Sequence, residues 1–321
     1  MIEIIEAPFD LCGKHVGSRL GATAMHLEGL VKHLSLSGRK VHLGPRAWPL
    51  NDELPEDKSL RISQAVDCYR SLKSEVSRSI REGRIPMVIG GDHSISIGSI
   101  SGALSELGQK IGVIWIDAHM DINLPIQSPS GNLHGMPLAA LLRIEDHTPG
   151  PLRTAWQAIL DEIVPNPGLQ PANLAWFGLR DVDLGEAENF AKLKVAQAMT
   201  MQDVDFLGVT GCMARVEQWI QREGIERLWI SFDVDSLDPI FAPGTGTAVR
   251  GGFTYREGHL IAELFYRMFQ GSSVKLAGFD VVEVNPLRDT QNETAKIAVE
   301  WTCSLFGKTI LHGKHPGRTE G

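Results

Sequence analysis

The sequence predicts an α/β fold in which a parallel sheet is covered by helices on both faces. Short apolar runs with the character of strands recur along the 321 residues, and stretches with helical spacing of apolar residues lie between them. Carboxylates and histidines follow several of these runs, at the strand ends where α/β enzymes build their sites. The hydrophobic content of 43% is sufficient for one large domain with a full core.

Each element is predicted from its own pattern. Helical spacing predicts helices over 60–82, 209–223 and 257–269. The Pro- and Gly-rich stretch 150–173 is expected to be a surface excursion. One domain is expected over residues 1–312, followed by a short polar tail over 313–321. Strands are expected at 2–7, 40–43, 86–89, 112–116, 174–178, 198–200, 228–232 and 275–279.

Composition excludes several classes of protein. The net charge of -8 argues against a nucleic-acid partner and suits a cationic substrate. No apolar run approaches the roughly 18 to 20 residues of a membrane helix, so no membrane partner is expected. The acidic start differs from a signal peptide, which predicts a cytoplasmic location. The four cysteines are widely scattered and are expected to be reduced thiols: Cys12, Cys68, Cys212 and Cys303.

Two segments place potential metal ligands at alternating positions, each behind an apolar run. Asp117, His119 and Asp121 form one set, and Asp233 and Asp235 form the other. Side chains two apart on an extended strand share a face, so each set can converge. Carboxylates so close together at the edge of a core need cations, because bare like charges in a low dielectric are costly. For the first set alone, a solvated turn would be an alternative.

A third strand ends in Gly90-Gly91-Asp92-His93, and we expect His93 to be a further ligand rather than a hydrogen-bonded structural residue. Six ligands, mostly carboxylates with two imidazoles, suit a pair of ions such as Mn²⁺ better than a thiolate zinc site. Two ions roughly 3.5 Å apart can deprotonate a shared water near neutral pH. The residues therefore predict a hydrolase, without naming the bond that is cleaved.

Residues 90–94 (GGDHS), 117–121 (DAHMD) and 231–239 (SFDVDSLDP) resemble the three metal motifs of the ureohydrolase family of arginases and agmatinases. The resemblance extends over nearly the whole chain and is closest to arginase. It implies a three-layer αβα sandwich around an eight-stranded parallel sheet, with two Mn²⁺ per subunit. It assigns one ion to His93, Asp117, Asp121 and Asp233, and the other to His119, Asp117, Asp233 and Asp235.

The loop after the second motif is similar to the arginase version. By this resemblance, Asn123, Ser130 and Asn132 hold the α-carboxylate of L-arginine. An agmatinase has no use for such a set, because agmatine lacks this carboxylate and the polar groups would be left unpaired.

Further substrate contacts follow from the same resemblance. Asp183 corresponds to the residue that takes the α-amino group, although it could instead cap a turn. Glu283 resembles the glutamate that pairs with the guanidinium, and a salt bridge with Arg288 is the alternative. The resemblance also implies substrate-binding roles for Glu186 and Thr247.

The implied reaction is attack of a metal-bridging hydroxide on the guanidinium carbon, which gives L-ornithine and urea. Asp121 would hold and relay the proton of the hydroxide. His134 resembles the family's proton shuttle, and an ordinary histidine pKa near 6.5 suits that role. As an isolated histidine it would more often be structural.

The sequence departs from the family pattern at several points. Met120 replaces the common Thr, Ser128 stands where Thr is frequent, and Ala248 replaces the usual Pro. Rival functions are a guanidinobutyrate hydrolase, an agmatinase, a catalytically silent binding or regulatory subunit, and a two-metal phosphoesterase. Asp183 favours arginine over guanidinobutyrate, and the filled ligand positions argue against a silent fold. The resemblance favours a homo-oligomer, either a trimer or a hexamer.

Overall fold

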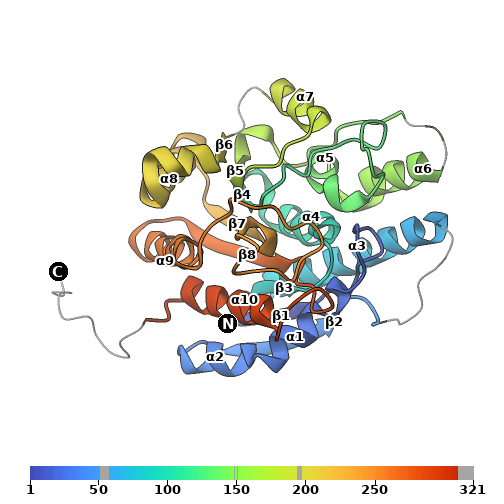
Figure 1. The fold of residues 1–321 in the computed structure, drawn as a ribbon. Helices are drawn as coiled ribbons and strands as arrows, with labels where there is room; N and C mark the ends of the chain where they lie inside the picture. The colour runs from blue at the N-terminus through green and yellow to red at the C-terminus, as the bar shows by residue number, and fades with distance from the viewer. Residues whose placement is uncertain (51–57, 148, 150, 194–196, 310–321) are drawn as a thin grey trace.

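A computed structural model of the chain describes residues 1–50, 58–147, 149, 151–193 and 197–309, and its centre is one eight-stranded sheet (Figure 1). The strand order is β2-β1-β3-β8-β7-β4-β5-β6, and all neighbouring strands are parallel. Every predicted strand is present, with shifted ends. The strands are β1 (Ile2–Glu6), β2 (Val41–Arg46), β3 (Ile85–Ile89), β4 (Ile111–Ile116), β5 (Leu174–Leu179), β6 (Gln197–Thr200), β7 (Arg227–Asp233) and β8 (Lys275–Val282).

Helices cover both faces of the sheet, which confirms the predicted three-layer αβα sandwich (Figure 1). On β7, Ile230 and Phe232 point into one core and Trp229 into the other, as alternation along a strand requires. One layer contains α1 (Gly21–Leu27), α2 (Leu30–Leu36), α8 (Met201–Glu223), α9 (Tyr255–Gly271) and α10 (Glu293–Leu305). The other contains α3 (Lys58–Arg81), α4 (Ser96–Leu107), α5 (Pro137–Leu141) and α6 (Pro151–Ala158).

The predicted helices agree with α3, α8 and α9, and the largest difference is at the start of α8. This helix begins at Met201, eight residues before the predicted start at 209. Thr200 caps it, since its hydroxyl accepts a hydrogen bond from the Asp203 amide. Gly208 then adopts φ 68°, which interrupts the helix and its apolar periodicity. The periodic pattern therefore identified only the part after the kink.

The stretch 150–173 differs from the expected surface excursion. It contains α6, a π-helical turn at Ile159–Ile163 and a 3₁₀ helix at Pro171–Asn173. Trp156 is 1% exposed, and its indole donates a hydrogen bond to the carbonyl of Ile144. The apolar side chains of this stretch lie at helical spacing, and they belong to the same core as α3 and α4. The expected polar tail lies outside the described residues.

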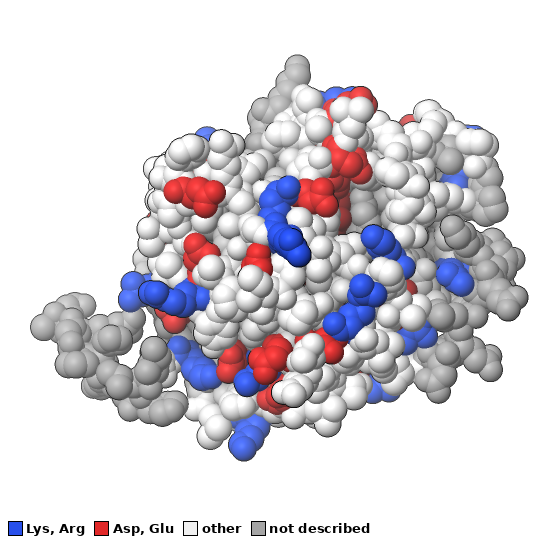
Figure 2. Space-filling model, in the orientation of Figure 1, with Lys and Arg blue, Asp and Glu red and all other residues white. Residues whose placement is uncertain are grey.

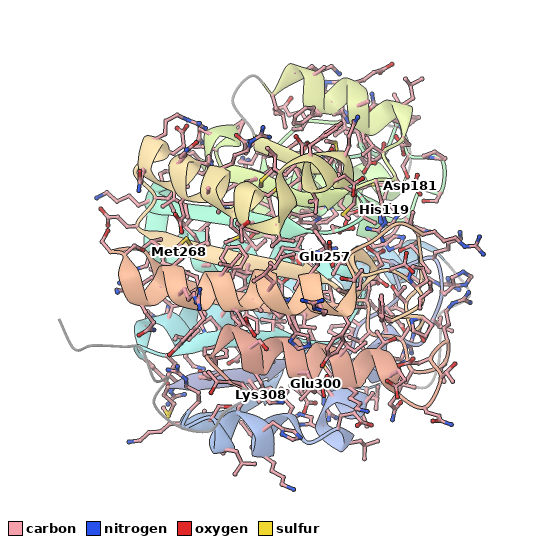
Figure 3. The ribbon with its side chains drawn as sticks, turned by 60° about the vertical axis from the view of Figure 1, so that its left-hand side comes forward. His119, Asp181, Glu257, Met268, Glu300 and Lys308 are labelled. Atoms are coloured by element: carbon pink, nitrogen blue, oxygen red, sulfur yellow. The ribbon has the colours of Figure 1, made fainter. Side chains whose placement is uncertain are left out.

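The carboxyl ends of the strands and the first turns of the helices lie on the same side of the molecule. Figure 3 shows His119 and Asp181 near the end of α9 that carries Glu257, while Met268 marks its opposite end. This edge of the sheet is where the sequence places its polar motifs. No helix among the described residues is both long enough and apolar enough to cross a membrane.

Two glycines bring α4 close to α3. A Cβ on Gly98 would lie 2.7 Å from the Tyr69 carbonyl oxygen, and one on Gly102 would lie 2.7 Å from that of Lys73. Contacts this short with backbone cannot be relieved by a side-chain rotation. The two helices therefore pack at a distance that only glycine permits at these positions.

We expect Gly98→Ala to destabilise the protein by about 1 to 3 kcal/mol, because overpacking outweighs the roughly 1 kcal/mol that alanine adds to helix propensity. Gly271→Ala is the matched control, since a Cβ at Gly271 in α9 meets no atom within 4 Å. Urea-induced unfolding followed by circular dichroism measures both variants. Equal stability of the two variants would contradict the packing argument.

Candidate active site

The first predicted ligand set follows β4, but it does not lie on the strand. The strand ends at Ile116, and the chain bends through Asp117 and His119 to reach Asp121, which has φ 52°. The Asp117 side chain fixes this bend, because its Oδ1 accepts a hydrogen bond from the His119 amide at 2.7 Å. The expected alternation along an extended strand is therefore wrong here. The side chains converge because the backbone turns.

The second and third sets come from the neighbouring loops. Asp233 ends β7, and Asp235 lies in the 3₁₀ helix Val234–Ser236 that follows. The Asp233 side chain accepts a hydrogen bond from the Asp235 amide at 2.8 Å. His93 begins the 3₁₀ helix His93–Ile95 after β3, and Asp92 caps that helix by accepting from the Ser94 amide. Each polar turn is thus stabilised by one of its own carboxylates.

The side chains of these three loops meet at one point. The Nδ1 atom of His93 lies 2.9 Å from Asp117 Oδ2, 3.0 Å from Asp233 Oδ2 and 3.2 Å from Asp121 Oδ2. On the other side of Asp117, the Nδ1 atom of His119 lies 3.2 Å from Asp117 Oδ1. Asp117 therefore stands between the two imidazoles.

Two ligand groups with metal-binding geometry share Asp117. One contains His93, Asp117 and Asp233, the other contains Asp117, His119 and Asp235, and the ligand atoms of each group lie within 4.8 Å of one another. Asp233 joins only the first group, and Asp121 belongs to neither, although it approaches His93. Both groups contain Asp117, and its bridging role stays a prediction. The bridging role of Asp233 and the ligand role of Asp121 stay predictions.

The electrostatics of the cluster fit a bound cation. Burial, followed by repulsion from neighbouring carboxylates, raises the pKa of Asp233 and Asp235, and burial with the charge of Asp117 raises that of Asp121 to about 6. Burial lowers the pKa of His93, but the three carboxylates around it raise it well above 6.5. His93 Nδ1 and Asp117 Oδ2 are buried and make no hydrogen bond within the described chain. Oxygen-rich groups with one imidazole each suit divalent ions such as Mn²⁺.

A cavity of about 160 Å³ opens over this cluster. Its wall is formed by several of the predicted metal ligands and by other side chains from the loops after β4, β5 and β7. Its lining residues are His93, His119, Asp121, Asn123, His134, Gly135, Asp181, Asp183, Glu186, Asp233 and Thr247. Figure 2 shows acidic side chains gathered below α7 (Leu184–Lys192). A strongly acidic pocket of this kind favours a cationic group.

His134 and Glu283 form a pair beside the cluster. His134 Nδ1 lies 3.0 Å from Glu283 Oε1, and the same oxygen accepts a hydrogen bond from the His93 amide at 3.0 Å. Burial lowers the pKa of His134, but Glu283 and nearby aspartates raise it to about 9. No ion pair joins Glu283 to Arg288 in the described part of the chain. The alternative role given to Glu283 is therefore not observed.

Asp183 has two sets of contacts. Its Oδ1 accepts a hydrogen bond from the Glu186 amide, and the Glu186 side chain accepts from the Asp183 amide, which forms a capping box at the start of α7. Its Oδ2 accepts from Asn123 Nδ2 at 2.7 Å. Burial raises the pKa of Glu186 to about 8. The capping role considered for Asp183 is thus observed, and the same carboxylate also lines the cavity.

The remaining predicted substrate contacts divide into two kinds. Thr247 lines the cavity, and its hydroxyl donates a hydrogen bond to Asp235 Oδ2 at 2.8 Å. Ser130 is exposed and Asn132 half-buried, and neither belongs to the lining of the cavity. The Ser130 hydroxyl instead accepts a hydrogen bond from the Asn132 amide. The structure brings Asn123, Asp183 and Thr247 to the cavity and leaves these two in the loop beside it.

Sequence reasoning gave no role to Arg180 and Asp181. The Arg180 guanidinium donates hydrogen bonds to the carbonyls of Asp235 (2.5 Å), Ser236 (3.1 Å) and Val249 (2.8 Å), among others. Asp181 Oδ2 lies 3.8 Å from His119 Nε2, and Figure 3 shows the two side chains close together. A usable signal was present, since Asp181 and Asp183 repeat after β5 the spacing of the two aspartates after β7.

Comparisons with known proteins identify relatives that match nearly the whole chain. The family model described as the Arginase family matches residues 1–307. The arginase of Staphylococcus aureus (strain COL) is 38% identical over 315 residues, which cover 97% of this chain and 98% of that protein.

Two solved structures extend the comparison. The arginase of Bacillus caldovelox has a TM-score of 0.84 at 34% identity, and that of Bacillus subtilis subsp. subtilis str. 168 has a TM-score of 0.85 at 34% identity. Each alignment covers 97% of this chain and 99% of the other. The match is therefore close in both sequence and fold over nearly the whole length. The chain belongs to the arginase family of hydrolases.

Proposed function

We propose that this protein hydrolyses L-arginine to L-ornithine and urea. The observation that supports this proposal is that one cavity combines potential metal ligands with polar side chains suited to the amino-acid end of a substrate. Two histidine–carboxylate groups share Asp117 at its base, and Asn123 and Asp183 lie at its side. The base suits activation of water, and the side offers polar partners to the amino-acid end of a substrate.

The proposed cofactor is a pair of Mn²⁺ ions held by His93, Asp117, His119, Asp121, Asp233 and Asp235. When bound, such a pair would lower the pKa of a water molecule to near neutrality and so supply hydroxide as the nucleophile. The buried atoms without hydrogen-bond partners and the raised carboxylate pKa values support a cation at this point.

The protein's own groups would then move the protons. Asp121, which lines the cavity beside His93, would be suited to take a proton from the attacking water and to release it again. The attack forms a C–O bond at the guanidinium carbon, and the C–N bond to the ornithine nitrogen breaks. His134, kept protonated beside Glu283, is suited to give the leaving nitrogen its proton. Glu283 would also orient the guanidinium as an acceptor of paired N–H groups.

Substrate selection is proposed to depend on Asp183 for the α-amino group and on Asn123, Ser130 and Asn132 for the α-carboxylate. Glu186 would contribute through Asp183, which it holds in the capping box. A guanidinobutyrate hydrolase and an agmatinase remain the competing activities, since each substrate lacks one of these groups. A silent binding subunit is disfavoured because every ligand position is filled.

The other parts of the proposal are a single domain over residues 1–312, a cytoplasmic location and assembly into a trimer or hexamer. The family resemblance supports the assembly.

The direct test is urea release by protein dialysed against chelator and reloaded with Mn²⁺, with L-arginine, agmatine and 4-guanidinobutyrate in parallel. We expect activity with L-arginine, at least about 100-fold less with each analogue, and none before reloading. A preference for an analogue would contradict the proposed substrate. Two bound ions with no urea from any substrate would favour the silent subunit.

A second test separates the two roles of Asp183. Asp183→Asn keeps a good helix cap but removes the charge, and Asn123 can turn its amide so that its Oδ1 accepts from the new NH₂ group. We therefore expect nearly unchanged thermal stability. The preference for L-arginine over 4-guanidinobutyrate, measured as the ratio of kcat/KM values, should fall about 10-fold or more. Asp203→Asn is the control, because it changes a carboxylate of the capping box of α8 that does not line the cavity. An unchanged ratio would leave Asp183 with a capping role only.

A third test concerns His134. His134→Ala should lower kcat about 100-fold or more, because the leaving amine loses its proton donor. Binding of two Mn²⁺ ions should be unaffected, since His134 belongs to neither ligand group. Steady-state kinetics and a metal titration measure the two quantities. Loss of a metal ion in this variant would assign His134 a different role.

A further inference from the structure

His93 is held on the side facing away from the carboxylates by a chain of buried hydrogen bonds. Its Nε2 atom lies 2.8 Å from Ser231 Oγ, and Ser231 Oγ lies 2.5 Å from Asp280 Oδ1. Ser231 and Asp280 are completely buried, and His93 is 1% exposed. The imidazole also stacks on Trp115 of β4, with ring centroids 3.8 Å apart and planes within 5°. The ring is therefore fixed in both position and plane.

Asp280 determines which group donates and which accepts in the hydrogen bonds from Asp280 through Ser231 to His93. The other carboxylate oxygen, Oδ2, accepts hydrogen bonds from Ser99 Oγ at 2.8 Å and from Trp229 Nε1 at 3.0 Å. Burial raises the pKa of Asp280, whereas the charge of His93 and the hydrogen bonds from Ser231, Ser99 and Trp229 lower it and favour the ionised form. An ionised carboxylate only accepts, so in this form the single hydrogen of the Ser231 hydroxyl points to Asp280. Ser231 then presents a lone pair to His93. A lone pair can be satisfied only by a hydrogen on Nε2.

We infer that Asp280 and Ser231 are positioning residues that keep a hydrogen on His93 Nε2, so that Nδ1, which faces Asp117, Asp121 and Asp233, is the nitrogen that gives up its proton to an incoming ion. A metal ligand needs a free lone pair, and the outer hydrogen bond fixes which nitrogen provides it. The inference rests on the metal centre proposed above. It assigns a function to two buried residues that touch neither substrate nor ion.

The indole of Trp229 determines how an amide at position 280 would be oriented. In Asp280→Asn, the side-chain amide has one acceptor and one donor end. Trp229 Nε1 can only donate, so it selects the amide oxygen at the Oδ2 position and leaves the NH₂ group facing Ser231. Ser231 would then accept from the new amide and donate to His93 Nε2 at 2.8 Å, the nearer of its two other neighbours, since Ser96 Oγ lies 3.4 Å away. The chain is reversed, and the histidine hydrogen is favoured on Nδ1, where the metal would bind.

The experiment is a titration of Mn²⁺ in competition with a chelating indicator, on folded full-length protein. We expect Asp280→Asn and Ser231→Ala each to weaken the binding of at least one ion about 10- to 100-fold. Ser99→Ala is the matched control, because it removes a hydrogen bond from the same carboxylate without touching the Ser231 branch. It should change affinity about 3-fold or less. Thermal unfolding of the metal-free variants checks that they fold.

A double variant tests the direction of the chain rather than its presence. Adding Trp229→Phe to Asp280→Asn removes the donor that fixes the amide, so the amide can rotate and present its oxygen to Ser231. Affinity for Mn²⁺ should recover several-fold relative to Asp280→Asn, although the core has lost another polar contact. A purely structural role predicts a further loss instead.

The outcomes separate this inference from the proposed function. Wild-type affinity in Asp280→Asn, or weaker binding in the double variant than in the single one, would overturn the inference. Failure of the wild-type protein to bind Mn²⁺ would overturn the proposed metal centre itself. Weakened binding in Ser99→Ala equal to that in Asp280→Asn would show that only the packing around the carboxylate matters, which also overturns the inference.

Discussion

The concentration of negative charge at the end of the central strands is the constraint on which the rest of the structure depends. Asp117, Asp121, Asp233 and Asp235 are all nearly or fully buried within a few ångströms of two imidazoles. In a low dielectric such a cluster is stable only with protons or cations among its members. The raised pKa values of three of the four carboxylates express this cost directly.

The scaffold holds these charges together by rigid means. Two of the aspartates also accept hydrogen bonds from the amides of their own turns, so the backbone cannot relax without losing those bonds. Behind the cluster, the sheet is buried on both faces and supplies aromatic support, as where Trp115 stacks on His93. A long loop would allow the carboxylates to move apart. Short turns that are tied to the ends of neighbouring parallel strands hold them in place.

Much of this architecture could be predicted, because it depends on local pattern. All eight strands and the layer arrangement follow from apolar runs and their alternation with helices, and the ligand residues stand in short motifs at strand ends. The parts that could not be predicted depend on contacts distant in sequence. Burial of Trp156 packs the stretch 150–173 onto the core. Gly208 interrupts the apolar periodicity of α8, so the first part of that helix could not be predicted from spacing.

Within the site, the sequence predicted which residues gather but not how they converge. Side chains were expected to share a strand face, whereas turns at Asp117 and Asp121 bring them together. Ser130 and Asn132 could not be placed from sequence, because the conformation of their loop decides whether they reach the cavity. The hydrogen-bond network from Ser231 to Asp280 needs coordinates, since the residues lie on adjacent strands in matching register.

The Arg180 guanidinium has a consequence for how such a protein can change. Arg180 directly follows β5, and its guanidinium donates hydrogen bonds to carbonyls of the loop after β7, including those of Asp235 and Val249. The acceptors of these bonds are backbone carbonyls. The side chains of that loop can therefore vary as long as the path of its backbone is kept. The two loops are therefore not independent modules. A loop transplanted from a relative at one of these strands would need its counterpart at the other, because a change in the path of either would shift Asp235 of the carboxylate cluster.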